Sequence, residues 1–546
     1  MQLNVSSFLS SQAKKNPEAK AIVYPFKPNF WSPKSYVDLS FSELDTMVDA
    51  LMHQFLSSGL KRGTRVLLMV KPGLDLIQIV FALLKLGAVP VVIDPGMGLG
   101  RFFECAKQSK VSMMIGGTVA ITLAKWFLRK EDCAKHTITV DAKFKAKLKK
   151  QLGAHRYDAF EAEANDLAAV LFTSGSTGKA KGVCYTHSMF FAQIQLIKEE
   201  YTIEPGEVDL PMLAVFALFN PALGMCTVVP EMNPSRPSKI NPKKIVDSIL
   251  DNQVTNSFGS PVIWSIILKY CQREKVVLPS LKRVIMAGAP APQSLIEQLK
   301  EYMPNGEIFT PYGATEALPI SSLSATEIIE KQVGELANGR KGNCVGRAMP
   351  NIKIEVIQPK EGTIVSIADV EKCATGAIGE IIVSGPTVSQ RYDQLPNATK
   401  LSKIEDEGFF WHRMGDMGWK DEDGFLWFCG RKVERVHTNE GVLETVCCEA
   451  IFNQLERVSR SALIDLGEGK AGIVIEPEAE CYPKTDAQIE SFKRILNDCA
   501  LGDPMTASIK DFFFRKQFPV DVRHNAKIHR LSLAKAIRDE RKKLGE

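Results

Sequence analysis

The 546-residue sequence contains no long uninterrupted apolar run. No uncharged apolar stretch reaches the roughly 20 residues that a membrane-crossing helix needs. The first residues, Met1 to Val5, also lack the basic start and apolar middle of an export signal. We therefore expect a cytoplasmic protein without a transmembrane segment.

A strong charge of one sign is missing as well. Lysine and arginine number 68 against 63 aspartate and glutamate, a formal net charge of +5. There is no basic stripe interleaved with aromatic residues, so nucleic-acid binding has no support. The 12 cysteines lack the spacing of metal ligands, which predicts free thiols. The composition, 45% hydrophobic and 24% charged, is that of a globular protein of several structural units.

Two familiar nucleotide-binding patterns are absent. A Walker A loop needs Gly, four residues, then Gly-Lys-Ser/Thr, but here Gly178-Lys179 is followed by Ala180. The glycine cluster Gly96 to Arg101 has arginine where the dinucleotide fingerprint requires its last glycine. These segments are therefore neither a Walker A loop nor a dinucleotide fingerprint.

A different loop, rich in glycine and hydroxyl groups, is present. It reads Thr173-Ser174-Gly175-Ser176-Thr177-Gly178-Lys179-Ala180-Lys181-Gly182 and follows the apolar run 167–172, which predicts a buried strand. Glycines let consecutive backbone N–H groups turn toward an anion, while the hydroxyls and lysines add donors and positive charge. The loop predicts a polyphosphate site; the alternative is a flexible surface turn.

Helix and strand patterns alternate from residue 40 to about residue 340. Apolar spacing predicts helices over 44–56 and 74–86, and strands over 66–70, 89–93, 113–115, 168–173 and 284–286. This order predicts an α/β protein with parallel sheets covered on both faces. Beyond residue 340 the pattern turns to β, with a hairpin around Asp423-Gly424, and a βα pattern resumes at 441. A domain boundary is expected near 430–432.

Four further segments carry candidate ligand groups, although each alone also fits an ordinary turn or a solvated charge. Gly288-Ala289-Pro290 would leave room for a flat ring, and the aspartate of Gly415-Asp416 would suit ribose hydroxyls. In the segment 312–316, Tyr312 would stack on a base and Glu316 would hold Mg²⁺ near phosphates; the alternative is a turn with a capping threonine. Lys527 precedes the final helix.

Together these segments resemble the core motifs of the adenylate-forming superfamily, which includes acyl-CoA synthetases, peptide-synthetase adenylation domains and luciferases. The resemblance covers nearly the whole chain, including Leu39 to Leu44, Leu84 to Ala88, Ile93 to Pro95, Gly379 to Ile381 and Gly430-Arg431. It implies a large N-terminal adenylation domain, residues 1–430, of parallel βα sheets plus a β-subdomain. A small mobile α+β domain, residues 431–546, would carry a catalytic lysine.

The resemblance also implies a reaction and its residues. A carboxylate attacks the α-phosphorus of ATP, giving an acyl-adenylate and pyrophosphate. Thr315 would bind the α-phosphate, Glu316 would bind Mg²⁺, and Lys527 would bridge the carboxylate and the α-phosphate and offset the charge of transfer. The other implied ATP-binding residues are Thr173, Ser174, Gly175, Ser176, Thr177, Gly178, Lys179 and Lys181 for the β- and γ-phosphates, Gly288, Ala289, Pro290 and Tyr312 for adenine, Asp416 and Arg431 for ribose, and Gly313 and Ala314 between them.

Three departures from the family pattern concern the acceptor. Thioester-forming members usually have Asp or Lys two residues beyond Gly-Arg as a hinge, and here that residue is Val433. The loop that lines their pantetheine tunnel reads His437 to Gly441, and their Phe-His segment reads Phe216 to Pro221. Features tied to CoA delivery are therefore altered while ATP features remain; drift in an ordinary ligase would also explain this.

A narrower resemblance is to the β-lactone synthetases of bacterial long-chain olefin biosynthesis, carried by residues 94–98, 216–224, 311–319 and 518–530. It implies a long-chain 2-alkyl-3-hydroxy fatty acid whose own 3-hydroxyl displaces AMP and closes a lactone, since both groups lie on one molecule. It also implies a multi-enzyme assembly. No motif identifies the base for ring closure, and His437 is a weak candidate.

Three alternatives remain. The first is a medium- or long-chain fatty acyl-CoA synthetase, and the second a fatty acyl-AMP ligase that serves a carrier protein. The third is an adenylate-binding regulatory protein, against which Lys527, Glu316 and Asp416 argue, because a binder needs no transfer lysine. In every enzymatic case we expect an apolar acyl pocket, with Phe216, Phe219 and Leu318 among residues 215–219 and 318–320 as candidates.

Overall fold

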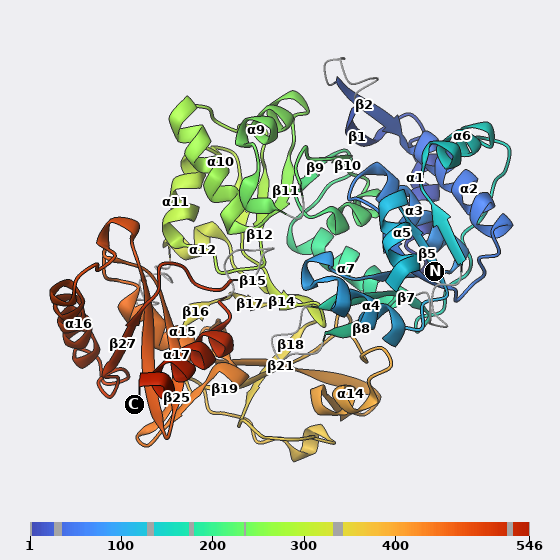
Figure 1. Ribbon diagram of the computed structural model, residues 1–546. Helices are drawn as coiled ribbons and strands as arrows, with labels where there is room; N and C mark the ends of the chain where they lie inside the picture. The colour runs from blue at the N-terminus through green and yellow to red at the C-terminus, as the bar shows by residue number, and fades with distance from the viewer. Residues whose placement is uncertain are drawn as a thin grey trace.

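The computed structural model describes residues 3–26, 35–127, 136–173, 180–233, 236–330, 342–520 and 528–544. Two mainly parallel sheets and a β-rich part form a large N-terminal region, and a smaller α+β unit follows (Figure 1). The predicted site residues Ser174 to Lys179 and Lys527 lie outside the described residues.

The first sheet has the strand order β6-β5-β3-β4-β7-β8. Its strands are β3 (Arg65–Met69), β4 (Val89–Val92), β5 (Met113–Gly116), β6 (His136–Thr139), β7 (Leu167–Thr173) and β8 (Lys181–Thr186). Alternate residues of β3 point to opposite faces: Val66 and Leu68 join one core cluster and Leu67 joins another. Both faces are therefore covered, as the continuous apolar strands predict.

Helices pack on each face of this sheet. One face carries α2 (Phe41–Ser57) and α3 (Leu74–Leu86), and the other α4 (Leu99–Gln108) and α5 (Thr118–Phe127). The helix predicted over 74–86 is confirmed, and it ends at Gly87 in the left-handed conformation. The other early helix begins at Phe41, before the predicted start at residue 44, because Ser40 and Glu43 form a capping box.

The second sheet has the order β13-β12-β11-β9-β10-β1-β2. Its strands are β1 (Lys20–Phe26), β2 (Ser35–Ser40), β9 (Val208–Pro211), β10 (Cys226–Val228), β11 (Asn256–Gly259), β12 (Arg283–Met286) and β13 (Glu307–Phe309). The helices α9 (Pro242–Asp251), α10 (Pro261–Glu274) and α11 (Gln293–Glu301) share one buried cluster with it. The predicted parallel sheets are confirmed; at one edge of each, β2 and β8 run antiparallel to their neighbours, which the sequence did not indicate. Eight residues separate β1 from β2 and seven separate β7 from β8, fewer than the dozen or more that a crossover between parallel strands needs.

Between and below these sheets lies the β-rich part (Figure 1). A small sheet of β14 (Tyr312–Ala314), β15 (Ala317–Ser322) and β17 (Arg347–Ala348) stands at the centre of the molecule. The remaining strands are β16 (Asn343–Cys344), β18 (Lys353–Ile357), β19 (Gly379–Ser384), β20 (Lys403–Asp406), β21 (Phe409–Lys420) and β22 (Leu426–Arg431). The predicted hairpin around Asp423-Gly424 is confirmed as β21 and β22, with Trp419 opposite Trp427.

The C-terminal unit has its own sheet, covered on both faces. Its strands are β25 (Val458–Gly467), β26 (Lys470–Pro477) and β27 (Asp511–Phe514), and a short hairpin, β23 (Val436–Thr438) and β24 (Gly441–Leu443), precedes them. Leu463 packs with α15 (Thr445–Phe452) and α16 (Asp486–Leu501), whereas its neighbours Ala462 and Ile464 pack with α17 (Arg530–Leu544). The unit therefore has a core on each side of one sheet.

The remaining helices are α1 (Ser6–Lys15), α6 (Ala142–Lys150), α7 (His187–Glu200), α8 (Asn220–Leu223), α12 (Ala325–Glu330) and α14 (Pro396–Ser402), with 3₁₀ turns η1 (Pro95–Met97), η2 (Ala214–Leu218), η3 (Pro237–Lys239), η4 (Ile367–Asp369), η5 (Lys432–Glu434) and η6 (Ala479–Cys481). In the described ranges no helix combines the length and apolar character needed to cross a membrane. The cysteines in these ranges are free thiols, as predicted.

Candidate active site

The predicted ligand segments gather at the carboxyl ends of parallel strands. Ile285 of β12 stands opposite Phe309 of β13, so Gly288 and Tyr312, each three residues farther on, leave neighbouring strands at the same edge. Gly259 ends β11 and η2 follows β9 at that edge too. Ligands of α/β sheets bind outside the carboxyl ends of the strands, so this edge is the expected place for a site.

A buried carboxylate joins three of the predicted ATP-binding residues. Asp416 lies in β21. Its Oδ2 accepts a hydrogen bond from the Tyr312 hydroxyl, and its Oδ1 forms an ion pair with Arg431 at 2.8 Å. Asp416 also stands opposite Arg431 in the β21–β22 register. Burial, and then the Asp416 charge, raises the pKa of Tyr312 well above its usual value, so the phenol remains a donor. The structure thus brings Tyr312, Asp416 and Arg431 into one cluster.

The turn between β14 and β15 presents Thr315 and Glu316. The main-chain carbonyl of Thr315 accepts a hydrogen bond from the buried Tyr185 hydroxyl at 2.6 Å. Glu316 is held twice: its Oε1 accepts from the Tyr392 hydroxyl at 2.7 Å, and its carbonyl accepts from the main-chain N–H of Ser389 at 2.8 Å. This turn is therefore fixed by partners far away in the sequence.

Tyr392 belongs to a segment, Ser389 to Asp393, that also reaches β8. Tyr392 forms an antiparallel β-bridge with Val183, and the Asp393 N–H donates to the carbonyl of Gly182 at 2.7 Å. The Lys181 ammonium lies 4.9 Å from the Tyr392 ring centre. Since Thr173 stands opposite Lys181 in the β7–β8 register, the predicted phosphate loop departs and returns beside this segment.

Two buried basic residues near Glu316 were missed from the sequence. Lys403 begins β20 opposite His412 of β21, and both are almost fully buried. Burial lowers the pKa of Lys403 to about 7, partly opposed by the Glu316 charge. Burial, and then the Lys403 charge, lowers the pKa of His412 well below its usual value. The sequence around Lys403 gives no signal of burial, because the residues that enclose its ammonium come from other segments, such as that of Ser389.

The described residues are suited to Mg²⁺ only together with phosphate oxygens. Within the described ranges no group of three or more His, Cys, Asp or Glu side chains could hold a metal ion. Magnesium typically takes one or two carboxylates plus substrate phosphates, and the half-buried Glu316, with one oxygen bonded to Tyr392, offers one carboxylate. The donor set therefore fits a metal delivered with a nucleotide.

Small residues follow β12, where the sequence predicts contacts with adenine. Gly288 has φ +94°, a conformation that favours glycine. Gly288 and Pro290 are exposed and Ala289 is half-buried, so the backbone of this turn is accessible. The contact between this turn and a nucleotide stays a prediction.

The candidate acyl residues lie in an apolar region. The Phe216 ring stacks on Phe258 with centroids 3.7 Å apart, and the Phe219 ring lies 6.1 Å from Phe216. Leu318 lies half-buried in β15. Beside this region is a cavity whose lining includes Pro72, Ile77, Met212, Ala217, Val229 and Met232. The apolar surroundings agree with an acyl pocket, although the side chain of Val215 lies outside what the structure describes.

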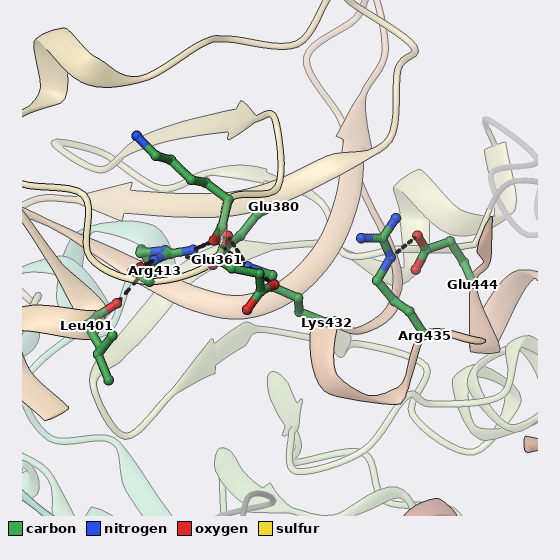
Figure 2. A network of polar contacts seen from close by, with 9 residues as sticks. Glu361, Glu380, Leu401, Arg413, Lys432, Arg435 and Glu444 are labelled. Carbon is green, nitrogen blue, oxygen red and sulfur yellow. Dashed lines mark hydrogen bonds and ion pairs between the residues drawn. The ribbon is translucent and has the colours of Figure 1, made fainter. Parts of the chain in front are cut away.

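Val433, which occupies the family's hinge position, has a charged residue in an ion pair on each side of it in the sequence. Figure 2 shows these residues, Lys432 and Arg435, with their partners. On the N-terminal side, Lys432 binds the buried Glu380 at 3.2 Å and the carbonyl of Lys360 at 2.7 Å. Arg413 binds the same glutamate with two hydrogen bonds. On the C-terminal side, Arg435 binds Glu444 at 2.8 Å. Val433 thus lies between a residue fixed to the large region and one fixed to the small unit.

His437, the weak candidate for the base of ring closure, is exposed on β23. Among the described contacts, none joins His437 to Glu316 or Asp416. The base for ring closure therefore stays unassigned. The domain boundary between residues 430 and 431 stays a prediction.

The fold and this cluster define an adenylate-forming enzyme, and the comparisons with known proteins agree. Residues 9–393 match the family model described as AMP-binding enzyme. The chain belongs to this family, and it is an ATP-dependent, AMP-forming ligase.

Two curated relatives indicate a narrower group within this family. The chain is 35% identical to an olefin beta-lactone synthetase of Xanthomonas campestris pv. campestris, over 97% of each chain. It is 35% identical to the olefin beta-lactone synthetase of Stenotrophomonas maltophilia, again over 97% of each chain. Among solved structures, ATP-bound MatB from Rhodopseudomonas palustris matches with a TM-score of 0.77 and 19% identity over 99% of each chain. That last likeness shows the fold.

Proposed function

We propose that this ligase makes a β-lactone from a long-chain 2-alkyl-3-hydroxy fatty acid. The observation that carries the proposal is the 35% identity to olefin beta-lactone synthetases over 97% of the chain. The cluster of Tyr312, Asp416 and Arg431, together with the Glu316 turn, supports adenylation as the first step. The apolar surroundings of Phe216 and Phe219 support an acyl substrate.

In the first step a carboxylate oxygen of the acid attacks the α-phosphorus of ATP. The bond between the α-phosphorus and the bridging oxygen to the β-phosphate breaks, and pyrophosphate leaves. Asp416 would accept hydrogen bonds from the ribose hydroxyls, held in place by Arg431 and Tyr312. Thr315 would bind the α-phosphate, and Lys527 would balance the charge that builds up on the transferred group.

In the second step the 3-hydroxyl oxygen attacks the acyl carbon of the adenylate. The carbon–oxygen bond to AMP breaks, the hydroxyl proton passes to a base, and AMP leaves with the bonding electrons. No acceptor from outside is needed, because nucleophile and electrophile lie on one molecule. The altered hinge residue Val433 and the altered loop His437 to Gly441 agree with a reaction that does not deliver CoA.

Magnesium would be held by Glu316 together with the ATP phosphates. Its chemistry when bound is to neutralise phosphate charge. The multi-enzyme assembly that the olefin pathway implies belongs to this proposal as well.

The decisive experiment incubates the purified protein with Mg-ATP and a long-chain 2-alkyl-3-hydroxy acid without CoA. We expect a β-lactone by NMR, with AMP and pyrophosphate in equal amounts by chromatography. A matched acid lacking the 3-hydroxyl should release pyrophosphate slowly and give no lactone. A thioester that forms only after CoA is added would overturn ring closure and assign the chain to the acyl-CoA synthetases.

A further inference from the structure

Lys403 is a buried lysine that the proposed mechanism does not use. Only 6% of its surface is exposed. Its ammonium donates to the main-chain carbonyl of Ser389 and, at 3.2 Å, to the Ser389 hydroxyl. Among the described residues no carboxylate lies within ion-pair distance of it, and Glu316 is the acid whose charge acts on it. Burying an amine without a paired carboxylate is costly, which points to a role beyond packing.

The partner of Lys403 is the residue that holds the Glu316 turn. The Ser389 N–H donates to the Glu316 carbonyl at 2.8 Å, and three residues later Tyr392 donates to the Glu316 carboxylate at 2.7 Å. The segment Ser389 to Asp393 therefore hydrogen-bonds to both the main chain and the side chain of Glu316. Fixing Ser389 also fixes the direction from which Tyr392 approaches.

The other end of this segment is anchored independently. Asp393 forms a two-bonded ion pair with Arg65 of β3 at 2.8 and 2.9 Å, and it accepts from Ser109 at 2.6 Å. Asp393 thus attaches one end of the segment to the first sheet, and the hydrogen bonds from Lys403 to Ser389 attach the other end to β20. Lys403 itself belongs to β20, which pairs with β21, the strand that carries Asp416. The lysine therefore links the Glu316 turn to the strand of the ribose-binding aspartate.

We propose that Lys403 is a positioning residue of the adenylation site, which holds Ser389 and through it sets the Glu316 carboxylate for the metal of Mg-ATP. This inference rests on the proposed role of Glu316. Burial also lowers the pKa of Lys403 to about 7, so near pH 7 the amine carries less charge than an exposed lysine, and both of its protonation states can donate to Ser389.

The test separates metal-dependent from metal-free nucleotide binding by calorimetry. Affinity is measured for Mg-ATP and for ATP in EDTA, and the ratio of the two reports the metal's contribution. We expect Lys403→Met to reduce that ratio at least fivefold while binding of metal-free ATP stays within twofold of wild type. A lysine with only a packing role would weaken both affinities together or neither.

Lys420→Met is the matched control. Lys420 also donates to a main-chain carbonyl of the same sheet, that of Ile354 at 2.9 Å, but it contacts none of the site residues described above. Both affinities should stay at the wild-type level. In a double-mutant cycle, Lys403→Met should add nothing to the loss caused by Glu316→Gln, because both act through one carboxylate.

Thermal unfolding accompanies each variant. If Lys403→Met does not fold, Ser389→Ala serves instead: it removes one of the two acceptors and should lower the ratio in part. A folded Lys403→Met protein, or a folded Ser389→Ala protein in its place, with the wild-type ratio would overturn the positioning role. A wild-type protein that binds Mg-ATP no better than metal-free ATP would instead overturn the role of Glu316, and this inference would fall with it.

Discussion

At the scale of single residues, the site depends on charges that are buried with a partner. Asp416 is 2% exposed and lies beside Arg431 and the Tyr312 hydroxyl. A carboxylate held by two donors is preorganised for two further hydroxyl groups, because its orientation is set before the nucleotide arrives.

Removing the tyrosine hydroxyl should therefore weaken ATP binding. We expect Tyr312→Phe to raise the KM for ATP roughly 5- to 10-fold, the equivalent of about 1–1.4 kcal/mol for one hydrogen bond, with a smaller effect on kcat. Steady-state pyrophosphate release measures both constants. Tyr201→Phe, which removes another buried hydroxyl, bonded to Ser322 at 3.3 Å, should leave the KM unchanged. An unaltered KM in Tyr312→Phe would contradict the ribose role of Asp416.

Lys527, the proposed transfer lysine, is expected to give the largest loss of activity. Lys527→Ala should abolish pyrophosphate release, since the neighbouring charge on carboxylate and phosphate would then be uncompensated. Binding of Mg-ATP should persist, because the ribose and Glu316 contacts are separate. If the variant releases pyrophosphate as fast as an active wild type, another cation performs the transfer. If wild type is as slow as the variant, the adenylate-binding regulatory alternative returns to consideration.

A buried aspartate should make stability depend on pH. Asp209 accepts hydrogen bonds from Asn220 and Asn256, and burial raises its pKa to about 7. Between its unfolded value near 4 and about 7 the folded protein retains a proton that the unfolded chain has lost. Stability from this group is therefore full at low pH, decreases as pH rises through that window and is constant above it.

Asp209→Asn should remove this dependence. Between pH 5 and pH 7 the variant should gain about 2 kcal/mol in free energy of unfolding relative to wild type, at about 1.4 kcal/mol per pKa unit. Urea titrations at the two pH values measure the difference. Other groups, such as His187 with its pKa lowered to about 4 by burial, cancel in the comparison. Parallel pH profiles for the two proteins would refute the assignment.

At the scale of elements, close approach decides which glycines matter. Gly430 of β22 has φ +136°, and a Cβ there would lie 2.2 Å from the Thr445 hydroxyl oxygen of α15. Gly424, in the hairpin turn, has φ +80° and no heavy atom within 4 Å of such a Cβ. A side chain would be strained by the positive φ at both positions, but only at Gly430 would it also collide with a neighbouring residue.

Gly430→Ala should therefore cost more than Gly424→Ala. We expect the free energy of unfolding to fall by about 1–3 kcal/mol more in the first variant, because overpacking adds to the strain of the left-handed backbone. Chemical denaturation of both proteins gives the difference. Equal losses would mean that α15 moves away from β22 without cost.

At the scale of the whole molecule, the Glu380 network joins distant parts. Glu380 of β19 binds Arg413 of β21 and Lys432 (Figure 2). Arg413 also donates to the carbonyl of Gly362, and Lys432 to that of Lys360. Removing one partner of a buried ion pair leaves an uncompensated charge.

Glu380→Gln should thus lower the free energy of unfolding by about 3–5 kcal/mol. The pairs of the half-buried Glu355 with Lys372 and Lys420 provide the control, and Glu355→Gln should cost less than about 1 kcal/mol. Denaturation by urea measures both. Losses of equal size would show that the Glu380 cluster adds no more than a surface pair.

Much of the element order could be predicted because it depends on local patterns. The helix 74–86 and the hairpin around Asp423-Gly424 are encoded by apolar spacing and by glycines that accept positive φ. The start at Phe41 and the antiparallel edges β2 and β8 were missed, since a capping contact and a neighbouring strand decided them.

The sequence by itself determined the class of chemistry. The order of the glycine-rich loop, the 312–316 turn, Asp416 and Lys527 suffices for that, because each motif is a short run of residues whose types and spacing are read along the chain. Only the tertiary structure decided what holds them. Lys403 and Ser389, Asp393 and Arg65, and Tyr312 and Asp416 are separated by 14, 328 and 104 residues. Which of them meet, and which charges are buried, is set by the packing of sheets, and no local pattern carries that information.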